Sequence, residues 1–482
     1  MMPVTTPVFT LQEIMNATGG RLLAGRTDLT VRGVSTDSRQ LVGENLFVAL
    51  KGENFNGHDF LDRAAKIGAF ALLVQAGENI ELKKVPSSIG VVEVTDTLAA
   101  LGDLAHAHRM RFSVPVIGLT GSSGKTTTRE MLAAILGMEK QVLTTQGNYN
   151  NLIGLPQTIF QLTARHDAAV LEMGTNTRGE IKRLTEIAAP DIGLITNIGP
   201  AHLAGFGSVE AVREEKGALW TTMKPTGCAV VNLDDESVGQ LAQRWTGSRV
   251  TYSMSADADV TVKDIKKRGA KGVRFQLVCG GRSCRIDMNI AGIHHIYNAM
   301  AAAAAARAFG AGHTAICEGL ASFLPVRGRM EIVALQNGAY LVDDSYNANP
   351  ASVREALLTL RDLKSTHRAF VFLGDMLELG EAAPEMHRKI GTLLGTTGVT
   401  AVFLQGDYAG NTASGALDGG LTEDQIIDIE SVDASLDSLK KKLRKGDWVL
   451  VKGSRGMKMD RIAAGIRAAF GVDSVHTDEA TH

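Results

Sequence analysis

The amino-acid sequence predicts an α/β protein of three domains, and three observations support this prediction. The chain has 482 residues, a length that corresponds to about three domains. Apolar strand-like segments alternate with helix-like segments, which is typical of parallel sheets covered on both faces. A loop rich in glycine and serine, "TGSSGKTT", joins one of these strands to a helix.

Residues 1–94 are expected to form a small N-terminal α/β domain. The segments at 44–50 and 69–74 have the composition of strands, and residues 58–68 between them are helix-like. Residues 95–112 then carry apolar side chains at helical spacing. This helix is expected to lead into the second domain.

Residues 95–325 are expected to form a central domain around a mostly parallel sheet. Its predicted strands are apolar segments that precede helix-like segments, at 114–120, 167–173, 191–198 and 227–233. Residues 260–290 differ, because short alternating strands with glycine turns predict an antiparallel appendage. The alanine-rich segment that follows is expected to be a helix ended by Gly310.

Residues 326–482 repeat the alternation of strands and helices in a Rossmann-like order. The strand-like segments are "AYLVDD", "HRAFVFLGD", "VTAVFLQGD" and "DWVLVK", and the helix-like ones are "PASVREALLTLRDL" and "MKMDRIAAGIRAAF". The last residues, "VHTDEATH", are expected to be frayed.

Composition excludes several classes of protein. The net charge of −2 argues against a dedicated nucleic-acid binder, which normally has a basic excess. The N-terminus lacks the charged and apolar regions of a signal peptide. The longest apolar helix is interrupted by Arg307 and is too short to span a bilayer. We therefore expect a cytoplasmic protein without membrane insertion.

Four cysteines occur, and no two of them form a C-x-x-C pair; they are Cys228, Cys279, Cys284 and Cys317. The favoured interpretation is small buried residues in a reducing compartment. A disulfide or a zinc site is the alternative.

The segment "GLTGSSGKTTT" at residues 118–128 predicts a phosphate-binding loop. Backbone N–H groups of such a loop converge on phosphate oxygens, and the helix beginning near Lys125 adds its positive end. Lys125 is expected to reach the β- and γ-phosphates, and the Thr126 hydroxyl to bind Mg²⁺. The strict motif needs a glycine where Leu119 stands, so the alternative is a turn that binds nothing.

Polar residues follow the next two predicted strands. Glu172 lies at the end of the strand predicted at 167–173. Asn197 and His202 lie in the segment at the end of the strand predicted at 191–198. Ligands of open α/β sheets lie beyond the carboxyl ends of the strands, so these groups are expected to share one rim. Glu172 is the better Mg²⁺ ligand, because oxygen suits this hard cation. The alternatives are an ordinary strand-end acid for Glu172 and a capping or packing role for His202.

Lys216 is predicted to face inward. Ser208 is a candidate N-cap, and counting by helical spacing from Val212 reaches Lys216. A buried lysine needs a partner or a lowered pKa, and a neutral amine can react with CO₂ to give an anionic carbamate ligand for a second Mg²⁺. The alternatives are a lysine whose ammonium extends to the surface or pairs with a phosphate.

Two segments near the C-terminus are further candidates. In "DDSYNANP", Asp343 and Asp344 are placed to accept hydrogen bonds from ribose hydroxyls. "KGSRG", at residues 452–456, lies between a strand and a helix and is suited to an anion. Turn formation is the alternative for each.

Several segments together carry a resemblance to a known family; they are "TGSSGKTT", "LEMGTN", "RGEI", "TNIGPAHL", "GFGS", the "KG" at Lys216, "DDSYNANP", "LGDMLELG" and "KGSRG". They resemble the Mur ligases of peptidoglycan synthesis over nearly the whole chain. Members of that family carry T-G-x-x-G-K-[ST], which residues 120–126 fit, so Leu119 is no defect. "DDSYNANP" and "GPAHLAGFGS" resemble the branch that adds D-alanyl-D-alanine.

The resemblance implies an ADP-forming acid–amino-acid ligase. ATP would phosphorylate the terminal carboxylate of UDP-N-acetylmuramoyl-tripeptide, and the amine of D-alanyl-D-alanine would then displace phosphate to give the pentapeptide. It implies a UDP-binding N-terminal domain, a P-loop-type ATP-binding central domain, two Mg²⁺ ions and small-molecule substrates. Nothing in the sequence suggests an obligate complex, so a monomer is expected. The alternatives are another ligase of this superfamily, such as the third-residue-adding enzyme or folylpolyglutamate synthetase, or a P-loop ATPase that ligates nothing.

The resemblance also assigns roles to residues. The ATP phosphates are assigned to Gly121, Ser122, Ser123, Gly124, Lys125, Thr126, Thr127 and Arg329, adenine to Asn298 and ribose to Asp344. One Mg²⁺ is assigned to Thr126 and Glu172, and the other to Glu172, His202 and carbamylated Lys216. The UDP end is assigned to Ser38, Lys51 and Gly52, and the muramoyl-peptide to Asn148, Asn151, Asn176 and Arg178. D-Alanyl-D-alanine or the transferred phosphate is assigned to Ser345, Asn347, Asn349, Lys452, Ser454 and Arg455. The family helix usually begins H-N-x-x-N, and this chain has His295 in place of the first Asn.

Overall fold

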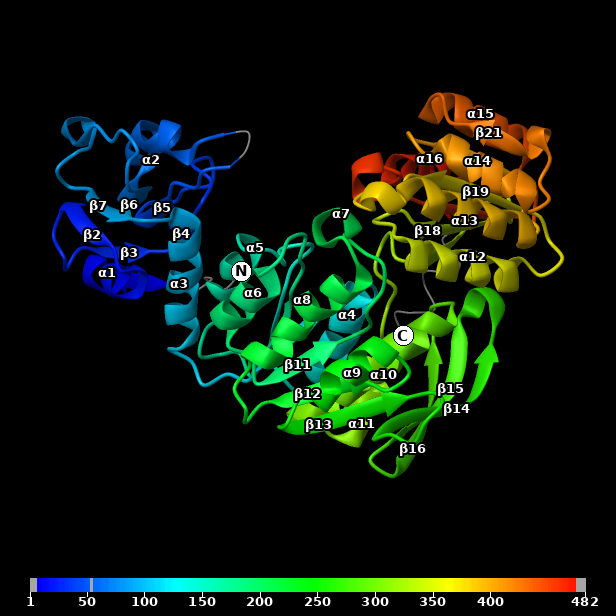
Figure 1. Ribbon diagram of the computed structural model, residues 1–482, viewed down its shortest axis with the longest axis horizontal. Helices are drawn as coiled ribbons and strands as arrows, with labels where there is room; N and C mark the ends of the chain where they lie inside the picture. Colours follow the sequence, from blue (N-terminus) through cyan, green and yellow to red (C-terminus); the bar gives the residue numbers. More distant parts are fainter. Residues whose placement is uncertain (1–6, 53–54, 474–482) are drawn as a thin grey trace.

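The computed structural model describes residues 7–52 and 55–473, so the predicted frayed tail lies outside the described residues. Figure 1 shows three lobes, with the first sheet at one end of the molecule and the last sheet at the other. The order of elements is the predicted α/β alternation. No helix within the described ranges combines the length and the apolar character that crossing a bilayer demands.

The N-terminal lobe is built on a five-stranded sheet with the order β2-β7-β6-β5-β4. Its strands are β2 (Arg21–Ala24), β4 (Val34–Ser35), β5 (Asn45–Val48), β6 (Ala69–Gln75) and β7 (Gly90–Val94). A separate pair, β1 (Val8–Thr10) and β3 (Thr30–Arg32), and the helices α1 (Leu11–Thr18) and α2 (Leu61–Ile67) accompany it. Two short 3₁₀ helices, η1 (Gly57–Phe60) and η2 (Leu82–Lys84), complete the lobe.

Helix α3 (Thr97–Arg109) follows β7 and joins the first lobe to the second (Figure 1). It packs against α6 (Glu180–Ala188) of the central lobe, where Arg183 donates a hydrogen bond to the carbonyl of Ala99 at 2.9 Å. The Arg109 guanidinium donates to the carbonyl of Ala188. The helix predicted to lead into the second domain therefore belongs to the packing of that domain.

The central lobe has a nine-stranded sheet with the order β16-β15-β14-β13-β12-β11-β8-β10-β9. Its strands are β8 (Val116–Thr120), β9 (Val142–Thr144), β10 (Ala168–Glu172), β11 (Ile192–Ile195), β12 (Cys228–Asn232), β13 (Ser248–Ser253), β14 (Val260–Lys267), β15 (Val273–Cys279) and β16 (Arg282–Met288). Across the sheet, every neighbouring pair of strands between β9 at one edge and β14 is parallel. The remaining neighbours, β14 with β15 and β15 with β16, are antiparallel. The predicted antiparallel appendage is thus an extension of the same sheet.

Helices cover both faces of the central sheet. They are α4 (Lys125–Gly137), α5 (Gly154–Ile159), α6 (Glu180–Ala188), α7 (Leu203–Phe206), α8 (Val209–Thr222), α9 (Glu236–Gln243), α10 (Ile293–Phe309) and α11 (His313–Ala321), with the short η3 (Gly269–Lys271). Helix α10 ends as predicted at Gly310, which has a φ of 96° that favours glycine. Gly319 of α11 lies directly against α4, because a Cβ there would be 2.4 Å from the Cα of Ile135.

The C-terminal lobe has a six-stranded sheet with the order β17-β18-β22-β19-β20-β21. Its strands are β17 (Glu331–Ala334), β18 (Tyr340–Asp344), β19 (Ala369–Gly374), β20 (Ala401–Gln405), β21 (Ile426–Asp428) and β22 (Trp448–Lys452). Its helices are α12 (Pro350–Lys364), α13 (Ala383–Thr396), α14 (Ala409–Asp418), α15 (Val432–Lys442) and α16 (Asp460–Phe470), with η4 (Gly380–Ala382), η5 (Glu423–Gln425) and η6 (Arg455–Met457). Only β17 runs antiparallel to its neighbour in the sheet described here.

The cysteines differ from the favoured prediction. Cys279 is buried and free, as expected, and Cys228 is free and half-buried. Cys284 and Cys317 instead form a disulfide, with their Cα atoms 6.4 Å apart. The pairing was not evident because β16 and α11 meet only in the folded chain, across a sequence separation of 33.

We predict that Gly319→Ala destabilises the central domain. The added methyl group would force α11 away from the backbone of α4, at a cost of about 1–3 kcal/mol. Gly137→Ala is the matched control, because no atom lies within 4 Å of a Cβ at that helix position. Thermal unfolding followed by tryptophan fluorescence, to which Trp220 and Trp245 of the central lobe contribute together with Trp448, measures both; equal melting of Gly319→Ala and the parent would refute the packing argument.

Candidate active site

A cavity of about 650 Å³ lies where the carboxyl ends of the central strands face the loops of the C-terminal lobe. Predicted site residues that line it from the central lobe are Ser122, Ser123, Gly124, Lys125, Thr126, Thr127, Asn148, Asn151, Glu172, Asn176, His202 and Asn298. Those that line it from the C-terminal lobe are Arg329, Asp344, Asn347, Asn349, Lys452, Ser454 and Arg455. The shared rim expected from the strand ends therefore exists.

The glycine-rich loop connects the end of β8 to the first residue of α4. Two glycines are required there: Gly121 has a φ of 153° and would place a Cβ 1.9 Å from the hydroxyl of Thr196, and Gly124 has a φ of 78°. The segment after β11 holds the loop open, because the side-chain oxygen of Asn197 accepts a hydrogen bond from the Ser123 N–H at 2.9 Å. The loop is thus shaped before any ligand arrives.

Lys125 is partly buried at the start of α4. Its ammonium donates to the carbonyl of Gly121 at 2.7 Å. Burial lowers the pKa of Lys125, the Glu172 carboxylate opposes this change, and the Arg329 guanidinium adds to it. An arriving phosphate would add negative charge next to this partly buried ammonium.

The Glu172 carboxylate is buried at the end of β10 and is hydrogen-bonded on both oxygens. It accepts from the Thr126 hydroxyl at 3.1 Å, from the Asn150 amide at 2.8 Å and from the Arg129 guanidinium at 2.9 Å. A carboxylate beside a hydroxyl is an oxygen donor pair of the kind that Mg²⁺ takes. The residues present therefore fit the predicted metal site.

His202 lies in the same cavity but is engaged with the C-terminal lobe. Its Nδ1 is 2.5 Å from a carboxylate oxygen of Glu378. The nearby N–H of Ala204 donates to the carbonyl of Glu378 at 3.0 Å. The lobe-to-lobe contact therefore sets the orientation of the imidazole ring.

Lys216 is on the inward face of α8, as predicted, and only 1% of it is exposed. Ser208 caps the helix through the N–H of Ala211. Burial, and then repulsion from Lys125, holds the pKa of Lys216 well below its usual value, while Glu215 opposes the change. The lysine does not line the cavity itself; it lies behind it, close enough to Lys125 to respond to its charge.

The C-terminal lobe contributes a buried ion pair. Asp344 ends β18 and Lys452 ends β22, the two residues are in register, and their charged atoms are 2.5 Å apart. Burial raises the pKa of Asp344 and lowers that of Lys452, and each partner opposes the change in the other.

Two hydrogen bonds dock this lobe onto the loop. Arg329 donates to the Thr126 hydroxyl at 3.3 Å, and Asn349 donates to the Ser122 carbonyl at 3.2 Å. Arg329 also stacks on the ring of Tyr346. Residues of the C-terminal lobe therefore contact the phosphate-binding loop directly.

Some predicted residues lie outside this cavity. Ser38, Lys51 and Gly52 belong to the N-terminal lobe, and Lys51 is paired there with Glu78 at 3.0 Å. Gly121, Arg178, Lys216 and Ser345 also do not line it. The Ser345 hydroxyl instead donates a hydrogen bond to the Asp343 carboxylate at 2.6 Å. The Asp343 carboxylate therefore stabilises the turn and does not face the cavity.

Four residues at the site were not anticipated: Arg129, Asn150, Glu215 and Glu378. Of these, only Arg129 could have been predicted from the sequence. It lies four residues after Lys125, on the same side of the helix, among the buried positions of α4. Glu215 accepts hydrogen bonds from the N–H groups of Gly179 and Ile181, so it anchors the loop that carries Asn176. Asn150 contacts Glu172 and Glu378 contacts His202, and neither contact follows from the spacing of these residues in the sequence.

Three family models match the chain in sequence order. Residues 30–109 match the Mur ligase family catalytic domain, 119–306 the Mur ligase middle domain, and 328–455 the Mur ligase glutamate ligase domain. The chain is 37% identical to UDP-N-acetylmuramoyl-tripeptide–D-alanyl-D-alanine ligase of Escherichia coli, over 95% of this chain and 98% of the relative.

Solved structures agree with the sequence comparisons. MurF from Acinetobacter baumannii superposes with a TM-score of 0.87 at 29% identity and covers 96% of this chain and 100% of its own. MurF ligase from Thermotoga maritima, in complex with ADP, superposes with a TM-score of 0.81 at 27% identity and covers 91% and 97% of the two chains.

We predict that Arg129 and Glu172 are energetically coupled. Arg129→Met would leave the buried carboxylate without its cation, at a cost of about 3–5 kcal/mol. Glu172→Gln in the same chain should recover part of this loss, because the amide carries no charge. Denaturant unfolding of the two single variants and the double variant gives the coupling, expected at about 1–3 kcal/mol; additive costs would contradict it.

Proposed function

The chain belongs to the Mur ligase family, and from this premise we propose that it joins D-alanyl-D-alanine to UDP-N-acetylmuramoyl-tripeptide with ATP. The products are UDP-N-acetylmuramoyl-pentapeptide, ADP and phosphate. The observation that carries the reaction class is the loop lysine Lys125 beside the Thr126–Glu172 pair in one cavity. The identities of the acceptor and the amine rest on the names of the relatives.

The first step activates a carboxylate, which is a poor electrophile at neutral pH. An oxygen of the tripeptide's terminal carboxylate forms a bond to the γ-phosphorus of ATP, and the bond to the β–γ bridging oxygen breaks. The loop N–H groups, Lys125 and Arg329 hold the phosphates and offset their charge. Mg²⁺ held by Thr126 and Glu172 would supply a Lewis acid that withdraws electron density from the phosphate oxygens.

The second step forms the amide. The neutral amine of D-alanyl-D-alanine attacks the acyl carbon, the bond from that carbon to the phosphate oxygen breaks, and the nitrogen loses a proton. Lys452, Ser454 and Arg455, with the turn that contains Asn347 and Asn349, present cationic and polar groups to the dipeptide carboxylate and the departing phosphate. Excluding water from this cavity protects the acyl phosphate from hydrolysis.

Lys216 is proposed to act as a carbamate. Its neutral amine nitrogen would bond to the carbon of CO₂ and release one proton, which converts the neutral side chain into an anionic carbamate. The lowered pKa of Lys216 supplies the neutral amine for this step. With Glu172 and the Nε2 atom of His202, the carbamate oxygens would complete a second Mg²⁺ site.

The long substrate is proposed to extend from the N-terminal lobe into the cavity. Ser38, Lys51 and Gly52 would hold the UDP end, while Asn148, Asn151, Asn176 and Arg178 would hold the muramoyl-peptide. Asn298 and Asp344 would receive the nucleoside of ATP, and Ser345 would support the turn. Because these groups belong to three lobes, substrate binding is expected to draw the lobes together. We also propose that the enzyme is cytoplasmic, because its nucleotide-linked substrates are soluble, and that it works as a monomer.

We predict strict dependence of ADP formation on both co-substrates. A coupled ADP assay of the whole chain should show turnover with ATP, UDP-muramoyl-tripeptide and D-alanyl-D-alanine together, and little when either acceptor or amine is omitted. Turnover with ATP alone would identify a P-loop ATPase that ligates nothing. Turnover with an amino acid in place of the dipeptide would identify another ligase of the superfamily.

We also predict that Lys216→Ala lowers kcat by about 10²–10³-fold, the loss that follows removal of one charge-stabilising group. Acetate or formate should restore part of the rate by occupying the place of the carbamate. Lys224→Ala, at an exposed lysine after the same helix, is the control. Full activity of Lys216→Ala without added carboxylate would rule out the carbamate.

A further inference from the structure

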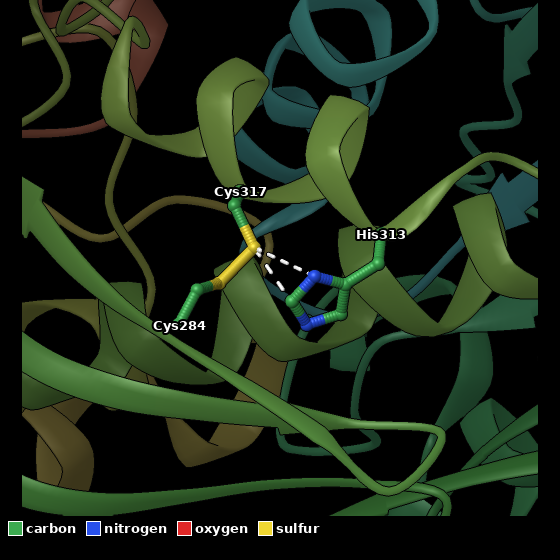
Figure 2. Close-up of side chains that lie close together, drawn as sticks. All are labelled: Cys284, His313 and Cys317. Atoms are coloured by element: carbon green, nitrogen blue, oxygen red, sulfur yellow. Dashed lines mark hydrogen bonds between the residues drawn. A yellow bond between two sulfur atoms is a disulfide. The ribbon is translucent and has the colours of Figure 1, made fainter.

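A second group of chemically reactive side chains lies on the far edge of the central sheet, outside the cavity. Cys284 of β16 faces Cys317 and His313 of α11, and Figure 2 shows the three side chains pointing toward one another. All three are partly exposed. None of them lines the proposed catalytic cavity, so the proposed ligase function leaves this cluster without a role.

The geometry points to a binding site for a thiophilic divalent cation, and we propose that the reduced cluster binds zinc through Cys284, His313 and Cys317. Two thiolates and one imidazole are a ligand set that zinc takes in proteins, with a water molecule in the fourth position. The inference stands whether or not the chain is a ligase.

Helical spacing pre-arranges two of the ligands. His313 and Cys317 are four residues apart in α11, so their side chains lie on one face of the helix. The Nδ1 atom of His313 is 3.6 Å from the sulfur of Cys317. In a tetrahedral site the usual zinc–sulfur and zinc–nitrogen bond lengths place these two atoms about 3.6 Å apart. This edge of the coordination tetrahedron is therefore already present.

The third ligand needs a change of redox state and a small movement. Cys284 and Cys317 are joined as a disulfide in this structure. In the reducing compartment proposed for this chain, protein thiols are kept reduced. A dithiol reductant of the thioredoxin class would give two electrons and two protons to the pair and become a disulfide itself. Zinc binding would then displace the two thiol protons to solvent.

The sulfurs must separate to make room for the ion. Tetrahedral zinc places two thiolates about 3.8 Å apart, farther than two bonded sulfurs, so the sulfurs must separate when the ion binds. Rotation about the Cα–Cβ bonds provides this movement, while the two Cα atoms stay at their 6.4 Å separation. The disulfide and the zinc complex are thus two alternative states of one site.

The site connects two elements of the central lobe. Strand β16 is the last strand of the nine-stranded sheet, and α11 packs against the helix that follows the phosphate-binding loop. A bound zinc ion would fasten this sheet edge to α11 when the disulfide is absent. Zinc should therefore raise the melting temperature of the reduced chain.

The test uses the whole chain, reduced with a phosphine that does not bind metal and then titrated anaerobically with Co²⁺ as a spectroscopic substitute for zinc. We expect one Co²⁺ per chain, with a thiolate-to-cobalt charge-transfer band that zinc abolishes. The band should be lost in Cys284→Ser and in Cys317→Ser and weakened in His313→Asn. Cys228→Ser, which removes a half-buried thiol elsewhere in the same sheet, should leave it unchanged. Co²⁺ held by oxygen ligands at Glu172 would give no such band.

A second measurement needs no variant. Zinc should slow the alkylation of Cys284 and Cys317 in the reduced chain, measured peptide by peptide, and leave Cys228 unaffected. A reduced chain without the charge-transfer band and without protection of these two thiols would overturn the proposal. A disulfide that persists in protein alkylated directly in acid-quenched cells would overturn it as well, because the pair would then be a lasting cross-link.

Discussion

The side-by-side pairing of β8 with β10 and β11 is the constraint on which the rest of the site depends. Glu172 is in register with Leu119, and Ile195 is in register with Thr120. The strands β8, β10 and β11 therefore end at the same edge of the sheet. The phosphate-binding loop, the Glu172 carboxylate and the Asn197 side chain lie next to one another there. Parallel strands bring their carboxyl ends to one edge, so chemistry dispersed along the chain converges in space.

Buried basic groups explain what this edge is suited to bind. Lys216 and Arg129 are buried and Lys125 is partly buried; Glu172 pairs with Arg129, the Glu215 carboxylate acts on Lys216, and burial lowers the pKa of both lysines. Burying charge without a partner is unfavourable. Polyanions such as ATP and a nucleotide-linked peptide relieve this cost on binding, and a carbamate on Lys216 would do the same. The same charges that bind the substrates also offset the charge that develops in phosphoryl transfer.

Local periodicity made much of this structure predictable. Most of the parallel strands, the loop, the start of α4 and the inward face of Lys216 follow from residues that are close in sequence. Strands β9, β13, β17 and β21 were not predicted, because they are short or rich in polar residues and show little apolar periodicity. The His202–Glu378 contact joins residues 176 positions apart, and the Cys284–Cys317 bond joins a strand to a helix. Such contacts depend on how the lobes and the layers of the sheet pack together. The spacing of residues in one sequence does not predict that packing.

Isotope transfer during turnover tests the central claim most directly. The account holds that this cavity moves the γ-phosphoryl group of ATP onto the terminal carboxylate of the tripeptide before the amide forms. With ¹⁸O in that carboxylate, the account predicts that mass spectrometry finds one labelled oxygen in each phosphate released with the pentapeptide. Phosphate free of label, formed while ADP accumulates and pentapeptide appears, would contradict the account.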